Sequence, residues 1–532
     1  MSASKLIQLG AFFLGCLLLL SSVQAETSPT WTQATALFKQ ASFDKTREAV
    51  DLLATSHEPQ AQQLLQALLD GQLYQHKQTD ALALLSDKDP LDLSTGQALG
   101  TVNKDDYRKV PINNTLRKYL RSKIGGLSLA NPDPKVRLAA TTGLLETITP
   151  EMLPQLQELA SKESDQAVKD ALQLGIHLAS LSATDKPTQL AAIQALDGNL
   201  NPLVRNKLNP LSTNADPEIA KAAQASLRSI ENKVSLNASI ETLFFGLSLG
   251  SVLVLAAIGL AITFGVMGVI NMAHGELIML GAYTTYFIQK LLPNYLDYSL
   301  ILAIPAAFMV SGLMGILIER TVIRHLYGRP LETLLATFGI SLILQQLVRT
   351  LVSPQNVPVS NPSWMSGSLE INSVLSITYN RLYIIAFTLL VFAILSYLLR
   401  KTKLGLQVRA VSQNRAMARA MGVRSARVDA LTFGLGSGIA GVAGVALSQL
   451  TNVGPNLGQS YIIDSFMVVV FGGVGNLWGT LVAGLSLGVI NKFLEPWAGA
   501  VLAKILVLVF IILFIQKRPR GLFPQKGRAA GD

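Results

Sequence analysis

Residues 243–263 read LFFGLSLGSVLVLAAIGLAIT, an uncharged run as long as a membrane-spanning helix. A helix needs about 20 consecutive, mostly apolar residues to cross the hydrocarbon core of a bilayer. Further apolar runs near that length follow at 275–290, 300–319, 332–352, 382–399, 430–450, 461–472, 479–491 and 500–516. We therefore predict a polytopic helical membrane domain over residues 239–532. It has nine spans if every run crosses, and seven if the short runs 461–472 and 479–491 form one re-entrant pair.

The composition of the whole chain supports a membrane protein preceded by a water-soluble part. Half of the 532 residues are hydrophobic, 15% are charged and the mean hydropathy is +0.39, whereas soluble domains carry about 25% charge. Residues 26–240 hold 22 basic and 24 acidic residues, while residues 241–532 hold 21 basic and ten acidic residues. An ordinary soluble enzyme is thereby excluded. Nucleic acid is not expected as a partner, because the soluble half has no compact basic patch with interleaved aromatic residues.

The first 25 residues have the form of a secretory signal peptide. Lys5 precedes the apolar run 6–20, and small residues stand before a cleavage site after Ala25. A retained membrane anchor is the alternative, and either would deliver residues 26–238 to the outside of the membrane. Cys16 is the one cysteine of the chain. Cleavage would remove it, so we expect no disulfide, thiol catalysis or Cys-ligated metal.

Residues 26–238 are predicted to form a helical repeat domain. Residues 133–140 (DPKVRLAA), 165–172 (DQAVKDAL) and 216–223 (DPEIAKAA) share an acidic start and a β-branched fourth residue. Asp is a good N-cap and Pro suits the first helical position, so each copy predicts the start of a helix with an apolar stripe. The template resembles HEAT-type repeats, although spacings of 32 and 51 residues are irregular. Such a surface suits protein docking, and a purely structural cap is the alternative.

The basic residues of the membrane half predict its orientation. Lys and Arg concentrate in short cytoplasmic loops, and 16 of the 21 lie in segments 320–329, 400–428 and 517–528. An exported start followed by an odd number of spans places these three segments on the cytoplasmic side. We thus expect a multi-pass protein of the bacterial inner membrane, with a periplasmic N-terminal domain and a cytoplasmic C-terminus.

Two polar, glycine-containing segments interrupt the apolar pattern, at 264–276 (FGVMGVINMAHGE) and 471–479 (FGGVGNLWG). Irregular backbone at membrane depth is tolerated where it lines a cavity or is buried in protein. The candidate substrate-pathway residues are Asn271, His274, Glu276, Gln345 and Asn476. Alternatively, Glu276 pairs with His274 or lies at the membrane interface, and Gln345 joins helices. We expect the many glycines between 434 and 444 to serve close helix packing rather than chemistry.

The cytoplasmic segment 400–428 is the candidate docking element for an ATPase. No Gly-Lys dipeptide occurs, so the chain lacks a phosphate-binding Walker loop, and ATP would have to be hydrolysed by another subunit. Residues 405–422 (GLQVRAVSQNRAMARAMG) predict a helix with small alanines on it and with Arg415 and Arg419 on one face. The alternative is a basic amphipathic helix that rests on anionic lipid headgroups.

Three ordered motifs carry a family resemblance: 271–282 (NMAHGELIMLGA), 405–422 with Arg409, and 471–479. They resemble the LivH-type permeases of branched-chain amino acid ABC importers, over residues 241 to the end. The long helical extension resembles the urea ABC transporter permease subunit of the UrtB type. The resemblance implies an all-α fold, a second LivM-like permease, two cytoplasmic ATPases and a periplasmic binding protein. It also implies that 405–422 meets an ATPase, through Arg409, Arg415, Ala418, Arg419 and Gly422.

The side chains of the membrane half favour a small neutral solute. A zwitterionic amino acid calls for charged partners, whereas urea needs only hydrogen-bond donors and acceptors, and this half is rich in Asn, Gln, Ser and Thr. We therefore expect an ATP-driven importer of urea or a small amide, with no enzyme activity, cofactor or metal of its own. His57, His76 and His177 show no metal-ligand spacing. The alternatives are a branched-chain amino acid importer, a passive urea channel, and a membrane-anchored sensor whose helical domain does the work.

Overall fold

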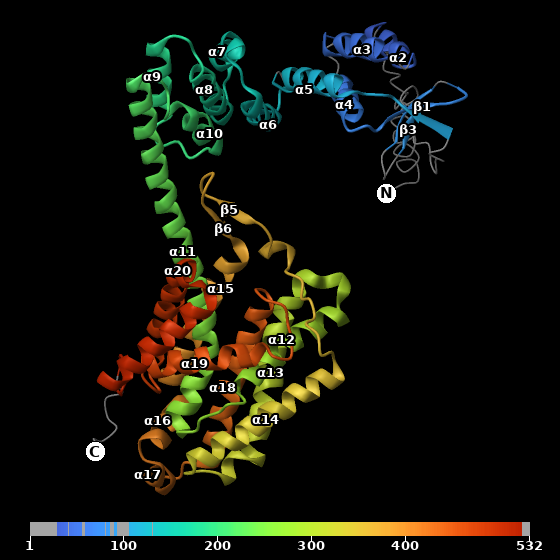
Figure 1. Cartoon of the computed structure of the whole chain (residues 1–532). Coiled ribbons are helices and arrows are strands. Elements are labelled where there is room, and N and C mark those ends of the chain that lie inside the picture. Colours follow the sequence, from blue (N-terminus) through green and yellow to red (C-terminus); the bar gives the residue numbers. More distant parts are fainter. Residues whose placement is uncertain are drawn as a thin grey trace, which may run out of the picture. The chain divides into compact units, whose positions relative to one another are not determined.

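The computed structural model describes residues 29–40, 42–55, 59–79, 81–85, 90–92, 106–129 and 131–523. The predicted signal peptide, with Cys16, and the residue His57 lie outside the described residues. The chain divides into two compact units, Met1–Ser229 and Ile230–Asp532 (Figure 1). The predicted domain boundary, between residues 238 and 239, lies inside helix α11 (Pro217–Met267).

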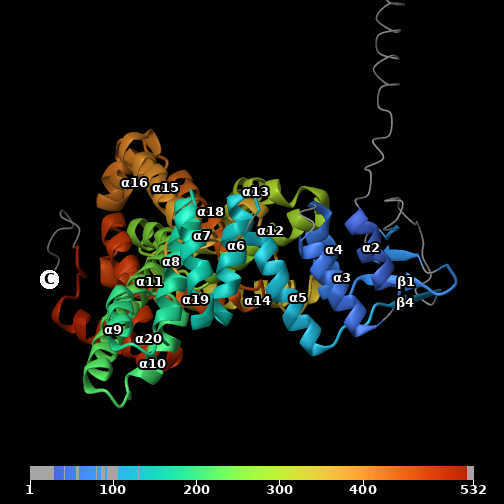
Figure 2. The same cartoon turned by 90° about the horizontal axis from the view of Figure 1, so that it is seen from above.

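The first part of the N-terminal unit contains a sheet, so the prediction of an all-α chain is wrong there. Figures 1 and 2 show this sheet beside α2 and α3. Its four antiparallel strands are ordered β3-β2-β1-β4. The elements are α2 (Pro29–Phe38), α3 (Phe43–Thr55), α4 (Pro59–Leu69), β1 (Leu73–His76), β2 (Leu82–Leu84), β3 (Leu91–Asp92), β4 (Tyr107–Lys109) and α5 (Asn114–Leu129). Strands of two to four residues are too short to show an alternating pattern in the sequence.

These short strands are held by a core shared with the helices. Leu73 of β1 and Leu82 of β2 are buried in one cluster with Trp31 and Phe38 of α2 and Leu120 of α5. Burial of a large apolar side chain stabilises the fold by about 1.5–3 kcal/mol. Tertiary burial therefore stabilises strands that no local pattern predicts.

The second part of this unit confirms the helix starts predicted from the repeated template. Asp133 caps α6 by accepting from the Lys135 amide, and Asp165 caps α8 in the same way. Asp216 accepts from the Glu218 amide at 2.9 Å, at the start of α11. The helices are α6 (Pro134–Leu144), α7 (Leu153–Lys162), α8 (Gln166–Ser180), α9 (Lys186–Ala195) and α10 (Pro202–Leu211).

Two further capped starts explain the irregular spacing of the template. Asp185 caps α9 and Asn201 caps α10, and both fall within the 51-residue interval between Asp165 and Asp216. Both starts keep a β-branched fourth residue, Thr188 and Val204, but the second begins with Asn instead of an acid, so the template was recognised at only three of the five helix starts. The resemblance to HEAT-type repeats stays a prediction.

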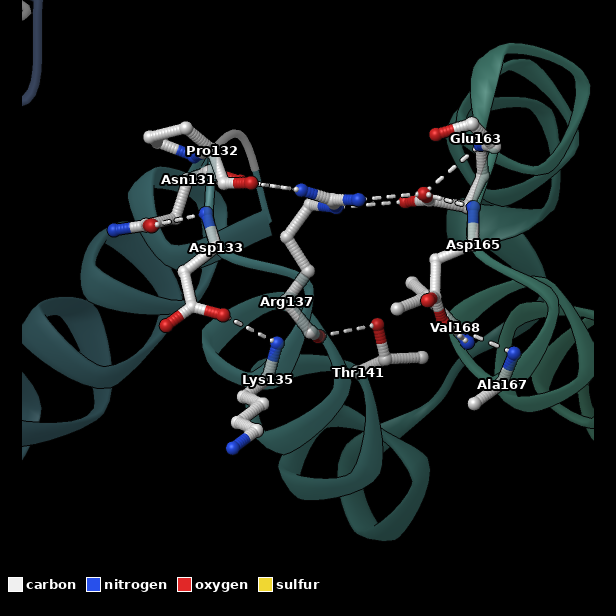
Figure 3. Close-up of polar contacts among 11 residues, drawn as sticks. Asn131, Pro132, Asp133, Lys135, Arg137, Thr141, Glu163, Asp165, Ala167 and Val168 are labelled. Atoms are coloured by element: carbon white, nitrogen blue, oxygen red, sulfur yellow. Dashed lines mark hydrogen bonds and ion pairs between the residues drawn. The ribbon is translucent and has the colours of Figure 1, made fainter.

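A partly buried ion pair joins the first copy of the template to the loop before the second, as Figure 3 shows. Arg137 on α6 donates to both carboxylate oxygens of Glu163, at 2.8 and 2.7 Å, and also to the carbonyls of Asn131 and Pro132. Glu163 also accepts from the amides of Ser164 and Asp165. The hydrogen bonds from Arg137 lower the pKa of Glu163 from 4.5 to about 2. Arg137 of the first template copy thus stabilises the loop that precedes α8.

The membrane unit is a bundle of helices that follows the predicted apolar runs. Among the described residues, six helices are long and apolar enough to cross a membrane: α11, α13 (Leu296–Thr321), α14 (Pro330–Leu351), α15 (Tyr379–Lys401), α18 (Ser425–Ser448) and α20 (Leu477–Lys517). The others are α12 (His274–Leu291), α16 (Lys403–Gln413), α17 (Arg415–Ala420) and α19 (Leu457–Gly472). Every predicted run overlaps a helix, so the prediction of a polytopic helical domain is confirmed.

Helix α20 is a hairpin of two helices that turns at Gly499, where φ is 77° and ψ is 160°. A straight helix of 41 residues would be about 60 Å long. Yet Asn476, just before its start, donates to the carbonyl of Phe523, beyond its end, at 3.1 Å. Leu487 and Ile511, from its two halves, share one buried cluster with α19. The runs 479–491 and 500–516 are thus separate helices, as the sequence predicts.

Glycines bring α18 into backbone contact with its neighbours, which confirms their predicted packing role. A side chain at Gly436 would meet the carbonyl of Gly259 on α11, and one at Gly444 would meet the carbonyl of Ile278 on α12. Gly441 faces the carbonyl of Ala307 on α13 in the same way. Small residues let membrane helices approach this closely, and van der Waals packing then holds them together.

The basic segments 320–329 and 400–428, together with the described part of the third, 517–523, lie at one end of the membrane unit, which we call the basic end. The Tyr327 hydroxyl, in the first segment, receives a 2.8 Å hydrogen bond from Arg415 in the second. Residues 522–523 line one cavity with residues of α16. At the other end, Val357 and Val453 pair, and the strands β5 (Ser368–Glu370) and β6 (Ser376–Thr378) form a hairpin. Figure 1 shows this hairpin and α17 at opposite ends of the unit.

Candidate functional site

The break between α11 and α12 forms because Gly268, at φ 69°, turns the chain out of helical geometry. Asn271 is fully buried, and its Oδ1 accepts from the amide of Ala273 at 3.0 Å. The amide of Met272 donates to Thr337 Oγ1 on α14 at 3.1 Å. Buried backbone N–H groups need hydrogen-bond partners. In this break, side chains supply the partners that a continuous helix would otherwise provide.

Glu276 lies in the first turn of α12 and is 1% exposed. Its Oε1 accepts from Gln345 Nε2 at 2.7 Å and from Ser341 Oγ at 3.0 Å, both on α14. His274 instead contacts the carbonyl of Ala256 on α11 through Nε2, at 2.8 Å. The alternative that Glu276 pairs with His274 is therefore wrong, and Gln345 does join two helices.

Three polar atoms of this buried cluster lack a hydrogen-bond partner within the described part of the chain. They are Glu276 Oε2, His274 Nδ1 and Asn271 Nδ2. Unpaired buried polar atoms cost about 1–3 kcal/mol each and are rare in folded proteins. We name Asn271, His274, Glu276, Ser341 and Gln345 the polar cluster. Its unpartnered atoms are one carboxylate oxygen, one imidazole nitrogen and one amide nitrogen.

Asn476, in the second break, has its side chain fully engaged. Its Oδ1 accepts from the amides of Trp478 and Gly479 and so caps α20, while Nδ2 donates to Phe523. Gly473 and Gly475 have positive φ values of 105° and 81°, which allow the tight turn before this cap. The structure therefore separates Asn476 from the other four predicted pathway residues and places it at the basic end.

The predicted docking helix over 405–422 is divided into α16 and α17 at Asn414, which caps α17 by accepting from the Met417 amide at 2.9 Å. Val408 and Val411 of α16 and Ala418 of α17 are buried in one cluster with Val428 of α18. The element thus buries one face on the rest of the membrane unit.

The arginines of this element turn toward their own chain. Arg415 forms an ion pair with Asp429, donates to Tyr327 Oη at 2.8 Å and lies 4.0 Å from the centre of that ring. Arg409 donates to the carbonyl of Leu399, at the end of α15. Arg419 donates from Nε to Ser425 Oγ at 2.7 Å. Burial raises the pKa of Tyr327, so its phenol stays protonated.

The outward surface of α17 is formed by methionines. Met417 is 60% exposed and Met421 is 78% exposed, beside Ala416 and Ala420. Gly422 ends the element at φ 87°, a conformation that suits glycine. An exposed pair of flexible, polarisable side chains is typical of a surface that binds a partner.

Sequence reasoning missed three acids and bases that the structure pairs. Asp429 holds Arg415, and Asp464 on α19 accepts from Lys504 on α20 at 2.9 Å. Asp429 and Asp464 are two of only ten acids after position 240; Asp464 stands inside the apolar run 461–472 and Asp429 directly precedes the run 430–450. Charged residues inside membrane segments need partners, so this placement was the available signal.

These features define a class: a multi-pass helical membrane protein with a buried polar cluster and a basic end that presents a short helical element. The family model described as "Branched-chain amino acid transport system / permease component" matches residues 242–515. The chain belongs to this family of transport permease components.

The relatives described next match about half of this chain. LivH, the high-affinity branched-chain amino acid transport system permease protein of Salmonella typhimurium (strain LT2), is 31% identical over 292 residues, which cover 53% of this chain and 94% of LivH. BraD, with the corresponding description in Pseudomonas aeruginosa, is also 31% identical, over 53% of this chain and 95% of BraD. The ribose import permease protein RbsC of Escherichia coli (strain K12) is 25% identical, over 52% of this chain and 84% of RbsC. No solved structure matches the chain significantly.

Proposed function

We propose that this chain is the pathway-forming permease subunit of an ATP-driven importer in the bacterial inner membrane. The observation that carries the proposal is the α16–α17 element, which is packed rigidly on its own unit while Met417 and Met421 stay exposed. Family membership and the absence of a Walker loop support an ATPase on a separate subunit. The proposed partners are two cytoplasmic ATPases, a second LivM-like permease and a periplasmic binding protein.

In the proposed docking element, the predicted residues Arg409, Arg415, Ala418, Arg419 and Gly422 stabilise its shape. Met417 and Met421 are the residues that we propose contact the ATPase. Replacing both with Asp should abolish ATPase co-purification and uptake, because two charges would be buried in the joint. Leu406→Asp on α16 is the matched control, since Leu406 is 62% exposed but lies outside α17. Normal co-purification of the double variant would refute the docking role.

We propose the polar cluster as the part of the pathway that contacts the cargo. Its three unpartnered polar atoms support this role. Glu276→Gln keeps the shape of the side chain and replaces an acceptor oxygen with a donor, so we expect a higher KM for uptake in a stably folded protein. Ser311→Ala, which removes a buried hydrogen bond to the Leu277 carbonyl outside the polar cluster, is the control. An unchanged KM for Glu276→Gln would sink the proposal.

Two cargoes are supported by different observations. The names of LivH and BraD favour branched-chain amino acids. Urea is favoured by the N-terminal extension, which lies outside the family match over residues 242–515, and by a cluster that is mostly uncharged apart from Glu276. Uptake of labelled leucine and labelled urea by cells with and without this chain decides between them.

The same assays separate the remaining classes. Gradient-driven urea flux in proteoliposomes that hold this chain alone would overturn the importer in favour of a passive channel. Deletion of residues 26–235 should leave transport measurable in a permease, whereas a sensor built on the helical domain would lose its function. Lys and Arg concentrate on the cytoplasmic side of membrane proteins, and the described parts of the three basic segments meet at the basic end. We therefore propose that the basic end is cytoplasmic and that the extension is periplasmic.

A further inference from the structure

A cavity of about 680 Å³ opens at the basic end of the membrane unit. It is formed by the ends of α11 and α15, by α16, by the turn before α20 and by residues 522–523. Part of its wall is apolar, with Ile262, Leu399, Val408, Leu477 and Phe523. The polar part contains two arginines, Arg400 and Arg409, with Ser412 and Gln413, and no lining residue is acidic. The cavity is therefore both basic and partly apolar.

Both arginines are positioned by other groups yet keep free donors. Arg409 donates through Nη1 to the carbonyl of Leu399, and a guanidinium has five N–H donors in all. The guanidinium carbon of Arg400 lies 6.0 Å from the ring centre of Trp478, which itself packs edge-on against Phe392 at 5.0 Å. Within the described residues, neither arginine meets a carboxylate. Two cations that lack acidic partners favour an anionic ligand.

The chemistry of the wall indicates which anion fits. The planar fork of Arg matches a phosphate oxygen pair, and two such forks beside hydroxyl and amide groups suit a phosphate ester. The apolar wall would gain nothing from a free phosphate ion but would cover an acyl chain. Trp478 is 49% exposed at the cavity edge, and tryptophan is enriched where membrane meets water.

We propose that this cavity binds an anionic phospholipid, with its phosphate on Arg400 and Arg409 and an acyl chain along the apolar wall. The site depends neither on the direction of transport nor on the identity of the cargo. Arg409 belongs both to the docking element and to this site, whereas the proposed contact residues Met417 and Met421 are not among the lining residues.

The experiment measures lipid binding to the full chain in mild detergent by native mass spectrometry. Phosphatidylglycerol and phosphatidylcholine with identical acyl chains are titrated separately, and we expect the anionic lipid to bind more tightly. Arg400→Gln together with Arg409→Gln should weaken it about thirtyfold, because each basic side chain near anionic lipid contributes about fivefold. Equal binding of the two lipids to the unmodified chain would overturn the proposal.

A matched control removes the same charge elsewhere at the basic end. Arg320→Gln with Arg324→Gln changes two exposed arginines outside the cavity, so binding should stay within twofold of the unmodified chain. An equal loss in both double variants would show general charge attraction and refute the site.

Two further arms address folding and the source of the phosphate. Ser412→Trp fills the cavity and keeps both arginines, so it should weaken lipid binding even if the arginine variants fold poorly; undiminished binding would contradict the proposal. Excess inorganic phosphate should fail to displace the lipid. Complete displacement would instead assign the site to free phosphate.

Discussion

The ion pair between Arg415 and Asp429 predicts an asymmetric response to mutation. The Asp429 side chain is 4% exposed, whereas that of Arg415 is 28% exposed and also stacks on Tyr327. Arg415→Met leaves a carboxylate buried without its partner. Asp429→Asn leaves a guanidinium that keeps Tyr327 and reaches water.

The magnitudes follow from this difference in burial. Removing one partner of a buried ion pair costs about 3–5 kcal/mol, and we take about 3 kcal/mol for Arg415→Met because Arg415 is partly exposed. Asp429→Asn should cost about 1 kcal/mol, the net value of one hydrogen bond. The double variant should be about 1–2 kcal/mol more stable than Arg415→Met alone, because its buried group is neutral.

Equilibrium unfolding of the purified chain in mixed micelles measures all three variants. Arg424→Met is the control, since Arg424 is exposed and has no side-chain partner in the described structure, and it should stay within about 0.5 kcal/mol of the unmodified protein. The reasoning fails if Arg415→Met costs no more than Asp429→Asn, or if the costs of the two substitutions add in the double variant.

Three further predictions address folding. Because the pKa of Glu163 is about 2 in the fold and 4.5 ordinarily, its stabilisation is complete above pH 4.5 and is lost as the pH falls toward 2; thermal melts across this range should fall less steeply for Glu163→Gln. Gly281→Leu should prevent α12 from packing on α18 and lower expression of folded protein, whereas Gly339→Ala, with open space around it, should be neutral or stabilising. Gly499→Val should destabilise the α20 hairpin by about 1–3 kcal/mol, measured by unfolding in mixed micelles, because residues other than glycine rarely adopt a φ of 77° with a ψ of 160°.

Local patterns in the sequence predicted the features that depend on neighbouring residues. Apolar run length located the membrane helices, and Asp followed by Pro located the starts of α6 and α11. Contacts between residues that are distant in the sequence could not be predicted from such patterns. Arg415 has Tyr327 as a partner 88 positions away, so its inward orientation could not be inferred from its helix alone. The strands β1 and β4 likewise depend on a pairing of Tyr74 with Lys109 across a long connection.

The two glycine-containing breaks share a sequence pattern but support different roles. Asn271 is completely buried and uses only its oxygen, so its amide nitrogen has no partner in the described structure, as is also true of His274 Nδ1 and Glu276 Oε2. In Asn476, by contrast, the side-chain oxygen caps α20 and the side-chain nitrogen donates to the carbonyl of Phe523. An unpaired buried donor gains free energy when a solute accepts from it, whereas a paired one must first give up its bond. The first break is therefore the better candidate for contact with cargo, and the second fixes the C-terminal segment against the wall of the basic cavity.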